Sequence, residues 1–320
     1  MRRATPQDQE QVLGLLGSAL RWSGDDRFGA FFAWKHLENA FGPSPAWVAV
    51  DQAKVVGFRA FLRWELESDG EVLRVVRAVD TATDPAHQRQ GIFSRLTRQA
   101  LTELADEGVA FVFNTPNEKS RPGYLKMGWV DIGRLPLVAR PRSLRALARV
   151  VQARQAADRW SHPTTAGIAA GEALADTDRV TALLGSQPHR PGMRTNRHAS
   201  FLRWRYGFEP LQYRAMPAGP DLDDGFAVFR VRRRGTATEA AVADVLVPGG
   251  DPRLAAQALR KVASAEGVDY AIALNPPGPH RAGFVPAVGQ GPRLVWRGLN
   301  RTEKPPPRSW DLVLADVELF

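Results

Sequence analysis

The residues best suited to chemistry lie between Arg77 and Trp129, where a strand-like run leads through a turn into a helix. The turn is Gln88–Ser94, with the sequence QRQGIFS, and the helical pattern begins behind Gly91. A turn of this kind is suited to bind an anion, because successive amides and the helix dipole point outward there. Gly91 would let the backbone approach a diphosphate closely, and Arg89 would add a formal positive charge. The segment therefore predicts a phosphate site.

Two further features follow this turn at compatible spacing. The apolar run Val109–Asn114 is typical of a buried strand, and Pro116 cannot continue a sheet ladder, so the chain must leave the sheet there. If this strand diverges from the one over 77–83, the gap between them exposes unpaired amides and carbonyls. An amide-bearing arm could lie in that gap as a substitute strand. Tyr124 comes just past the gap, where a phenol could protonate a departing thiolate.

These motifs resemble those of a known enzyme family. The pattern Gln88-x-x-Gly91-x-Phe93 resembles the Gln/Arg-x-x-Gly-x-Gly/Ala pyrophosphate loop of the GNAT N-acetyltransferases, with Phe93 in place of the small last residue. The segment Tyr124–Trp129 is similar to their Tyr-x-Lys-x-Gly-Phe element. The likeness covers residues 1–138, and a weaker repeat extends it over most of 180–320. The chain thus resembles a tandem GNAT protein with a degenerate C-terminal copy.

The resemblance implies acetyl-CoA as the acyl donor, no metal, and roles for individual residues. Tyr124 would be the general acid, and its alternative is a packed aromatic. The general base stays open among Asp80, Glu65, Glu118 and the terminal carboxylate of Phe320. We take Asp80 as the catalytic candidate; its alternative is a hydrogen bond to a neighbouring loop. The residues implied to bind the donor come from the strand edge, the loop and one asparagine: Thr81, Thr83, Gln88, Arg89, Gln90, Gly91, Ile92, Phe93, Ser94 and Asn117.

The elements that position these residues follow an α–β–β–β–α–β–α–β order, which predicts an α/β fold with a mixed sheet and helices on both faces. Ser68-Asp69-Gly70 is a hairpin signal between two of the strands. Periodicity predicts helices over 8–22, 27–38 and 93–107, and strands over 47–50, 55–66, 72–83, 109–114 and 130–138.

The second half repeats the first in order, which predicts two tandem GNAT-like domains. For example, FFAWKH at 31–36 recurs as FLRWRY at 201–206. The second copy lacks a phosphate-loop motif before its helix at Arg253 and a tyrosine before Gly283. It is therefore expected to bind no CoA and to form one wall of the acceptor cleft. The predicted parts are an acetyl-CoA-binding domain over 1–139, a helical connector over 140–166 and the degenerate copy over 167–320.

Composition excludes several classes of function. With 320 residues and no cysteine, the chain has room for two domains and can form neither disulfides nor thiolate sites. Six scattered histidines predict no metal site. A net charge of +9 suits nucleic acid, a membrane surface or a polyanionic small molecule equally. The Arg-rich segment 143–160 lacks interleaved aromatics, so we expect no nucleic-acid and no membrane partner.

The sequence thus predicts a cytoplasmic enzyme, a monomer or homodimer, that transfers an acetyl group directly from acetyl-CoA to the amine of a small-molecule or peptide acceptor. The polar N-terminus and the lack of a long apolar run favour the cytoplasm. Three alternatives stay open. They are a longer acyl group or a hydroxyl or hydrazine acceptor, a non-catalytic acyl-CoA sensor, and a nucleic-acid binder with steep salt dependence.

Overall fold

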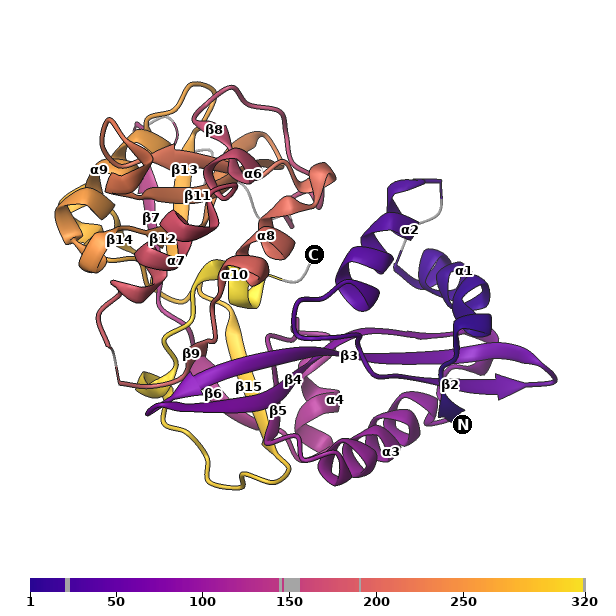
Figure 1. Ribbon diagram of the computed structural model, residues 1–320. Helices are drawn as coiled ribbons and strands as arrows, with labels where there is room; N and C mark the ends of the chain where they lie inside the picture. Colours follow the sequence, from indigo (N-terminus) through magenta and orange to yellow (C-terminus); the bar gives the residue numbers. More distant parts are fainter. Residues whose placement is uncertain (21–23, 144–145, 147–155, 190, 319–320) are drawn as a thin grey trace. The chain divides into compact units, whose positions relative to one another are not determined.

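The computed structural model describes residues 1–20, 24–143, 146, 156–189 and 191–318 (Figure 1). The chain divides into two compact units. Unit 1 comprises Met1–Gly133 and Arg293–Pro307, and unit 2 comprises Arg134–Pro292 and Arg308–Phe320. Among the described residues, no helix is long and apolar enough to cross a membrane. The predicted helix over 143–160 lies largely outside the described residues, and its described end, 156–160, is not helical.

Unit 1 is a mixed sheet with helices α1 and α2 on one face and α3 and α4 on the other (Figure 1). Its strands lie in the order β1-β2-β3-β4-β5-β15-β6. The predicted helices and the first four predicted strands of this half are confirmed to within a few residues. The elements are β1 (Arg2–Arg3), α1 (Gln9–Leu20), α2 (Arg27–Phe32), a π-helical turn (Ala33–Leu37), β2 (Ala46–Asp51), β3 (Lys54–Ser68), β4 (Glu71–Thr83), α3 (Ile92–Asp106), β5 (Phe111–Asn114), α4 (Arg121–Lys126), β6 (Val130–Arg134) and β15 (Arg293–Gly298).

The long hairpin β3–β4 is closed by the turn that the sequence predicts. Asp69 and Gly70 have φ values of 53° and 84°, and Ser68 pairs with Glu71 across them. Asp-Gly with both residues in the left-handed region matches the twist of the flanking strands, which explains the tight connection.

Helix α3 packs on the sheet through a single apolar face. Ile92, Leu96, Ala100 and Leu104 are buried at helical spacing and join one core with the strands. Gly57 of β3 permits this close approach, because a Cβ atom there would lie 2.5 Å from Cγ2 of Ile92. Burial of each large apolar side chain contributes about 1.5–3 kcal/mol, so this face fixes the start of α3 against β3.

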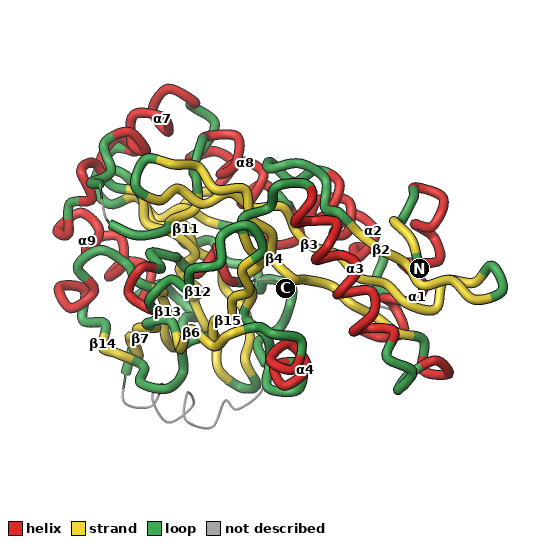
Figure 2. Tube along the Cα trace, turned by 90° about the horizontal axis from the view of Figure 1, so that it is seen from below, coloured by secondary structure: helices red, strands yellow, loops and turns green. Residues whose placement is uncertain are grey.

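Unit 2 is built on a second mixed sheet, in the order β8-β10-β11-β12-β13-β7-β14. In Figure 2 strands β11, β12, β13 and β7 can be followed one after another across it. Its elements are β7 (Leu137–Pro141), β8 (Ile168–Ala169), α6 (Ala170–Ala173), α7 (Thr177–Gly185), β9 (Arg194–Thr195), α8 (Ala199–Gly207), β10 (Arg214–Pro217), β11 (Phe226–Arg234), β12 (Ala237–Leu246), α9 (Pro252–Ala263), β13 (Tyr270–Leu274), β14 (Val285–Pro286) and α10 (Leu314–Val317).

The main paths of the two sheets have the same strand order, and each main path contains one strand from the opposite half of the sequence. Strand β15 lies between β5 and β6 in unit 1, and β7 lies between β13 and β14 in unit 2. In Figure 1, β15 is therefore a yellow strand among purple ones, and β7 a magenta strand among orange ones. The prediction of one strand over 130–138 is wrong. The chain forms two strands there, β6 and β7, and they belong to different sheets.

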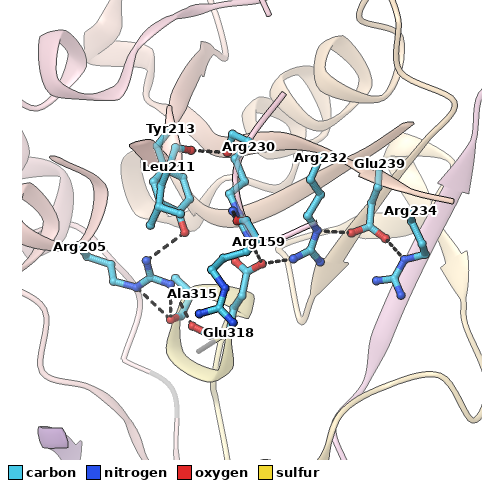
Figure 3. Close-up of polar contacts among 11 residues, drawn as sticks. Arg159, Arg205, Leu211, Tyr213, Arg230, Arg232, Arg234, Glu239, Ala315 and Glu318 are labelled. Carbon is cyan, nitrogen blue, oxygen red and sulfur yellow. Dashed lines mark hydrogen bonds and ion pairs between the residues drawn. The ribbon is translucent and has the colours of Figure 1, made fainter. Parts of the chain in front are cut away.

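A network of buried charges holds the C-terminal segment within unit 2 (Figure 3). The carboxylate of Glu318 accepts hydrogen bonds from Arg230, at 2.7 Å, and from Arg232. Arg205 donates to the backbone carbonyls of Ala315 and Glu318 at 3.0 and 3.3 Å, and to the Tyr213 hydroxyl at 2.9 Å. Burial opposes ionisation here, yet the arginines lower the pKa of Glu318 to about 2. The carboxylate is thus charged at neutral pH. Its Oε1 accepts from both arginines, whereas Oε2 is buried and has no hydrogen-bond partner among the described residues.

Candidate functional site

The predicted phosphate loop has the geometry of an anion site. Arg89 and Gly91 have φ values of 62° and 73°, and the loop over 88–91 is exposed. Gly91 is the N-cap of α3 and contributes no capping side chain. The first bond of the helix runs from the Arg95 amide to the Gly91 carbonyl, at 3.0 Å. The amides over 92–94 therefore lie at the helix N-terminus without an intrahelical acceptor, which is the arrangement that an anion satisfies.

Strands β4 and β5 diverge at the position that the sequence analysis requires. Within the described residues β4 pairs with β5 only at Val76 and Arg77, although β4 continues to Thr83. The edge of β4 over 78–83 thus has no ladder to β5. Thr81 and Thr83 both lie on this edge, and the Thr81 hydroxyl donates to the Phe58 carbonyl at 3.1 Å. Backbone groups of this edge are available to a ligand strand.

Tyr124 lies on α4 and is 4% exposed. Its ring packs edge-on against Phe93, at a centroid distance of 5.9 Å, and against Trp129, at 5.1 Å. The bulky Phe93, which departs from the usual loop pattern, therefore supports Tyr124 from the first turn of α3. The ring of Tyr124 is thus packed, and its hydroxyl makes no hydrogen bond to a described residue.

Beside Tyr124 lies Arg59, which the sequence analysis missed. Arg59 is fully buried, and its guanidinium lies 5.4 Å from the ring centroids of both Phe93 and Tyr124 and 4.6 Å from that of Phe61. Nη1 donates to the Val79 carbonyl at 2.9 Å. Nε and Nη2 are buried and have no hydrogen-bond partner among the described residues. The available signal was a pair of arginines, Arg59 and Arg63, inside an otherwise apolar strand, VVGFRAFLRW.

Asp80 lies at a bulge of β4 and bonds to two residues of the π-helical turn. Its carboxylate is 2.9 Å from Nζ of Lys35 and 2.8 Å from Nε2 of His36. Lys35 and His36 are 2% and 3% exposed. Although burial opposes its charge, Lys35 and His36 hold the pKa of Asp80 below its usual range. A carboxylate with a lowered pKa is a weak proton acceptor. Asp80 thus makes a specific contact, but with a helix and not with a loop.

The other predicted residues are dispersed. Asn117 is exposed, and its side-chain oxygen accepts from the Ser120 amide at 2.9 Å, which braces the turn before α4. Glu118 is exposed in the same segment. Glu65 lies six residues along β3 from Arg59, roughly 20 Å at the usual rise of a strand. The end of the chain at Phe320 lies outside the described residues. Among the described residues no group of three or more His, Asp or Glu side chains could hold a metal ion.

Comparison with known proteins identifies one matching family model and several solved structures with a similar fold. Residues 1–131 match the model of the acetyltransferase (GNAT) domain. A probable N-acyltransferase from Enterococcus faecalis has a TM-score of 0.62 at 13% identity, over 93% of this chain and 71% of its own. A GCN5-related N-acetyltransferase from Anabaena variabilis has a TM-score of 0.61 at 14% identity, over 93% and 72%. Eis1 from Mycobacterium abscessus has a TM-score of 0.56 at 17% identity, over 93% and 73%. These likenesses show a shared fold. No curated protein shows significant sequence similarity to the chain.

Proposed function

Residues 1–131 belong to the GNAT superfamily, and from this premise we propose that the chain transfers an acetyl group from acetyl-CoA to the amine of a small-molecule or peptide acceptor. The observation that carries the proposal is the alignment of three features in unit 1. They are the free amides at the start of α3, the unpaired edge of β4 and the ring of Tyr124 on α4. Each suits one part of the donor: the diphosphate, the amide-bearing arm and the sulfur.

The residues of unit 1 fit this donor, whereas the corresponding helix of unit 2 does not. The N-cap of α9 is Asp251, whose carboxylate accepts from the amides of Arg253 and Leu254 at 2.6 and 3.4 Å. Those donors are occupied, and the carboxylate would repel a phosphate. At α3 the N-cap is Gly91, which leaves the amides free. We therefore propose that unit 1 binds the donor and that unit 2, a degenerate copy of the same fold, does not.

The proposed reaction is a direct transfer. The amine must first lose a proton, because an ammonium has no lone pair. Its nitrogen then attacks the thioester carbonyl, so that a C–N bond forms and the C–S bond breaks. A backbone amide of the β4 edge would stabilise the developing oxyanion, and Tyr124 would give its proton to the departing thiolate. Arg59 adds positive charge beside that ring, where negative charge would develop.

The test combines binding with turnover. Isothermal titration calorimetry with CoA should show one site per chain. A thiol-release assay with acetyl-CoA should show turnover on members of a panel of amines, amino sugars, amino acids and peptides. Binding without turnover on the whole panel would contradict an acetyltransferase and favour an acyl-CoA sensor. Longer acyl-CoA donors and hydroxyl or hydrazine acceptors belong in the same panel, because the site as described does not discriminate among them.

A further inference from the structure

We propose that His36 is the residue that removes the proton from the acceptor amine, and that Asp80 is a positioning residue that fixes the orientation of the imidazole. This inference rests on the proposed acetyl transfer and adds the proton acceptor that the transfer requires. His36 was not among the catalytic candidates from the sequence, where it appeared only as the last residue of the repeated motif FFAWKH.

The first support is the π-helical turn that carries His36. The Glu38 amide donates to the carbonyl of Ala33, five residues earlier, at 3.0 Å. Single π-helical turns are rare and frequently lie at functional sites. Neighbouring residues of a regular helix do not face the same point. Here the side chains of Lys35 and His36 nevertheless both reach the carboxylate of Asp80.

The second support is the bulge that carries Asp80. Arg59 of β3 is opposite Thr81 and Phe61 is opposite Ala78, so Val79 and Asp80 share the space across from Ala60. A bulge redirects a side chain and is over-represented next to active sites. This one lies on the part of β4 that has parted from β5, one residue before Thr81. Two departures from regular backbone, one in a helix and one in a strand, thus meet in one contact beside the proposed donor site.

The third support is the hydrogen bonding of the imidazole. An ionised Asp80 can only accept, so Nε2 of His36 carries the hydrogen and Nδ1 carries the lone pair. Nδ1 is buried, and no described residue hydrogen-bonds to it. A buried hydrogen-bond acceptor without a partner costs free energy. The amine of the acceptor substrate would supply the missing partner.

The ionisation states agree with this role. Burial lowers the pKa of His36, so the ring is neutral near pH 7. Burial also makes the imidazole a weaker base, and the carboxylate of Asp80 opposes that effect. Lys35 and Asp80 are the ionisable groups in contact with it among the described residues, and the ring of Phe32 packs against it at 4.7 Å. Once protonated, the imidazolium would face the negative charge of Asp80. The proton of the amine thus moves to Nδ1, the amine attacks the thioester, and His36 later returns that proton to water.

Unit 2 contains the same kind of contact without the imidazole. In the repeated motif the place of His36 is taken by Tyr206, whose hydroxyl lies 3.2 Å from a carboxylate oxygen of Asp244. Asp244 also follows a bulge, because Val228 pairs with Asp244 while Phe229 pairs with Val242. Burial raises the pKa of Tyr206 well above its usual range, so the phenol cannot accept a proton. In unit 2 the contact between the helix and the bulge is therefore structural. In unit 1 the same contact includes an imidazole that can accept a proton.

The test compares His36→Gln and His36→Ala with Tyr206→Phe, which removes the corresponding contact in unit 2. We expect the His36 variants to bind CoA like the wild type in calorimetry, and to lose about 100- to 10,000-fold in kcat/KM for the amine. In the wild type, kcat/KM should rise with pH as His36 loses its proton, and this rise should be absent from the His36 variants. Added imidazole should restore part of the rate of His36→Ala. Tyr206→Phe should keep both the rate and the pH profile.

A second variant keeps the inference testable if the His36 variants fold poorly by circular dichroism. Asp80→Asn retains the size of the side chain but can no longer hold the imidazole in one tautomer, so we expect lower kcat with unchanged CoA affinity and a shifted pH profile. Wild-type rate and pH dependence in His36→Gln, or in Asp80→Asn, would overturn this inference while leaving acetyl transfer intact. Absence of CoA binding or of turnover in the wild-type protein would instead overturn the proposed function.

Discussion

At the residue scale, the proposed chemistry depends on side chains that the fold packs tightly. Tyr124 is enclosed by Phe93 and Trp129, and the buried guanidinium of Arg59 lies beside it. Such packing fixes the position of a proton donor and limits the reorganisation that transfer requires. It also separates the two proposed proton transfers. Arg59 and Tyr124 contact Phe93 of α3 on one face of the sheet, and the π-helical turn that carries His36 continues α2 on the other.

The direct test of the proton donor is Tyr124→Phe. The ring and its contacts remain, so we expect CoA affinity to change little. Turnover should fall by roughly ten- to a thousandfold, because the thiolate must then take its proton from water. Steady-state kinetics and calorimetry on the same preparation measure both effects. Unchanged turnover would remove Tyr124 from the chemistry and leave it as a packing residue.

Only part of the proposed site could be predicted from the sequence. The loop at Gly91, the edge at Thr81 and the ring of Tyr124 could be predicted, because local motifs encode them. The contacts of His36 and Arg59 could not, because they depend on a π-helical turn and a strand bulge that bring separate segments together. Irregular backbone of this kind is set by tertiary packing and leaves no period in the sequence.

At the element scale, α3 and α9 differ at the N-cap, the position that we propose decides whether each helix can bind an anion. Both follow a strand of a similar sheet, but α3 begins at a glycine and α9 begins at an aspartate that occupies its own amides. The two turns also offer a matched pair of glycines. Gly91 and Gly249 have φ values of 73° and 58°, and a Cβ atom on either would meet nothing within 4 Å.

We therefore expect Gly91→Val to weaken CoA binding by tenfold or more, and Gly249→Val to leave it unchanged. Both variants strain the backbone alike, by about 1–3 kcal/mol, because a β-branched residue is forced into the left-handed region. Only the first distorts amides that we assign to the diphosphate. Calorimetric titration of the two variants measures the difference. Equal loss in both would indicate a general effect on folding.

The buried network around Glu318 makes a prediction about acid stability. The folded-state pKa of Glu318 is lowered from 4.5 to about 2, so its stabilisation is complete above pH 4.5 and is lost as the pH falls toward 2. Glu318→Gln should destabilise the protein at pH 7 by roughly 3 kcal/mol, because Arg230 and Arg232 lose their buried partner.

Denaturant unfolding at pH 7 and at pH 3 checks the sign. The gap between Glu318→Gln and the wild type should narrow at pH 3, where the wild-type carboxylate also loses part of its stabilisation. Glu266→Gln, at an exposed carboxylate of unit 2, is the control and should change stability little at either pH. A gap that stays constant with pH would contradict the ionised network.

At the scale of the whole molecule, the exchange of β7 and β15 decides how the chain can be divided. Residues 1–139 contain six strands of the first sheet but lack β15, which belongs between β5 and β6. No local pattern of the sequence predicts this, because β15 has the composition of an ordinary last strand. The order of the elements could be predicted from the sequence, whereas the sheets that β7 and β15 join could not.

We expect a fragment of residues 1–139 not to fold cooperatively. A second fragment, in which a short glycine-rich linker joins residues 1–135 to residues 292–307, should fold. The linker can be short, because the Leu135 amide already donates to the Pro292 carbonyl at 2.9 Å. Circular dichroism and thermal unfolding of the two fragments make the comparison. Equal cooperativity would show that β15 is dispensable to the first sheet.

The exchanged strand also sets an order of events during synthesis. About 180 residues separate the end of β5 from the start of β15. At about 5–20 residues per second, the ribosome needs roughly 10–40 s to make them. Throughout that interval the nascent first half exposes the edge of β5, a completely buried strand with the sequence FVFN. Until β15 emerges, that edge is open to wrong pairing, so a chaperone that covers it would raise the yield of native protein, and slower synthesis would lower it.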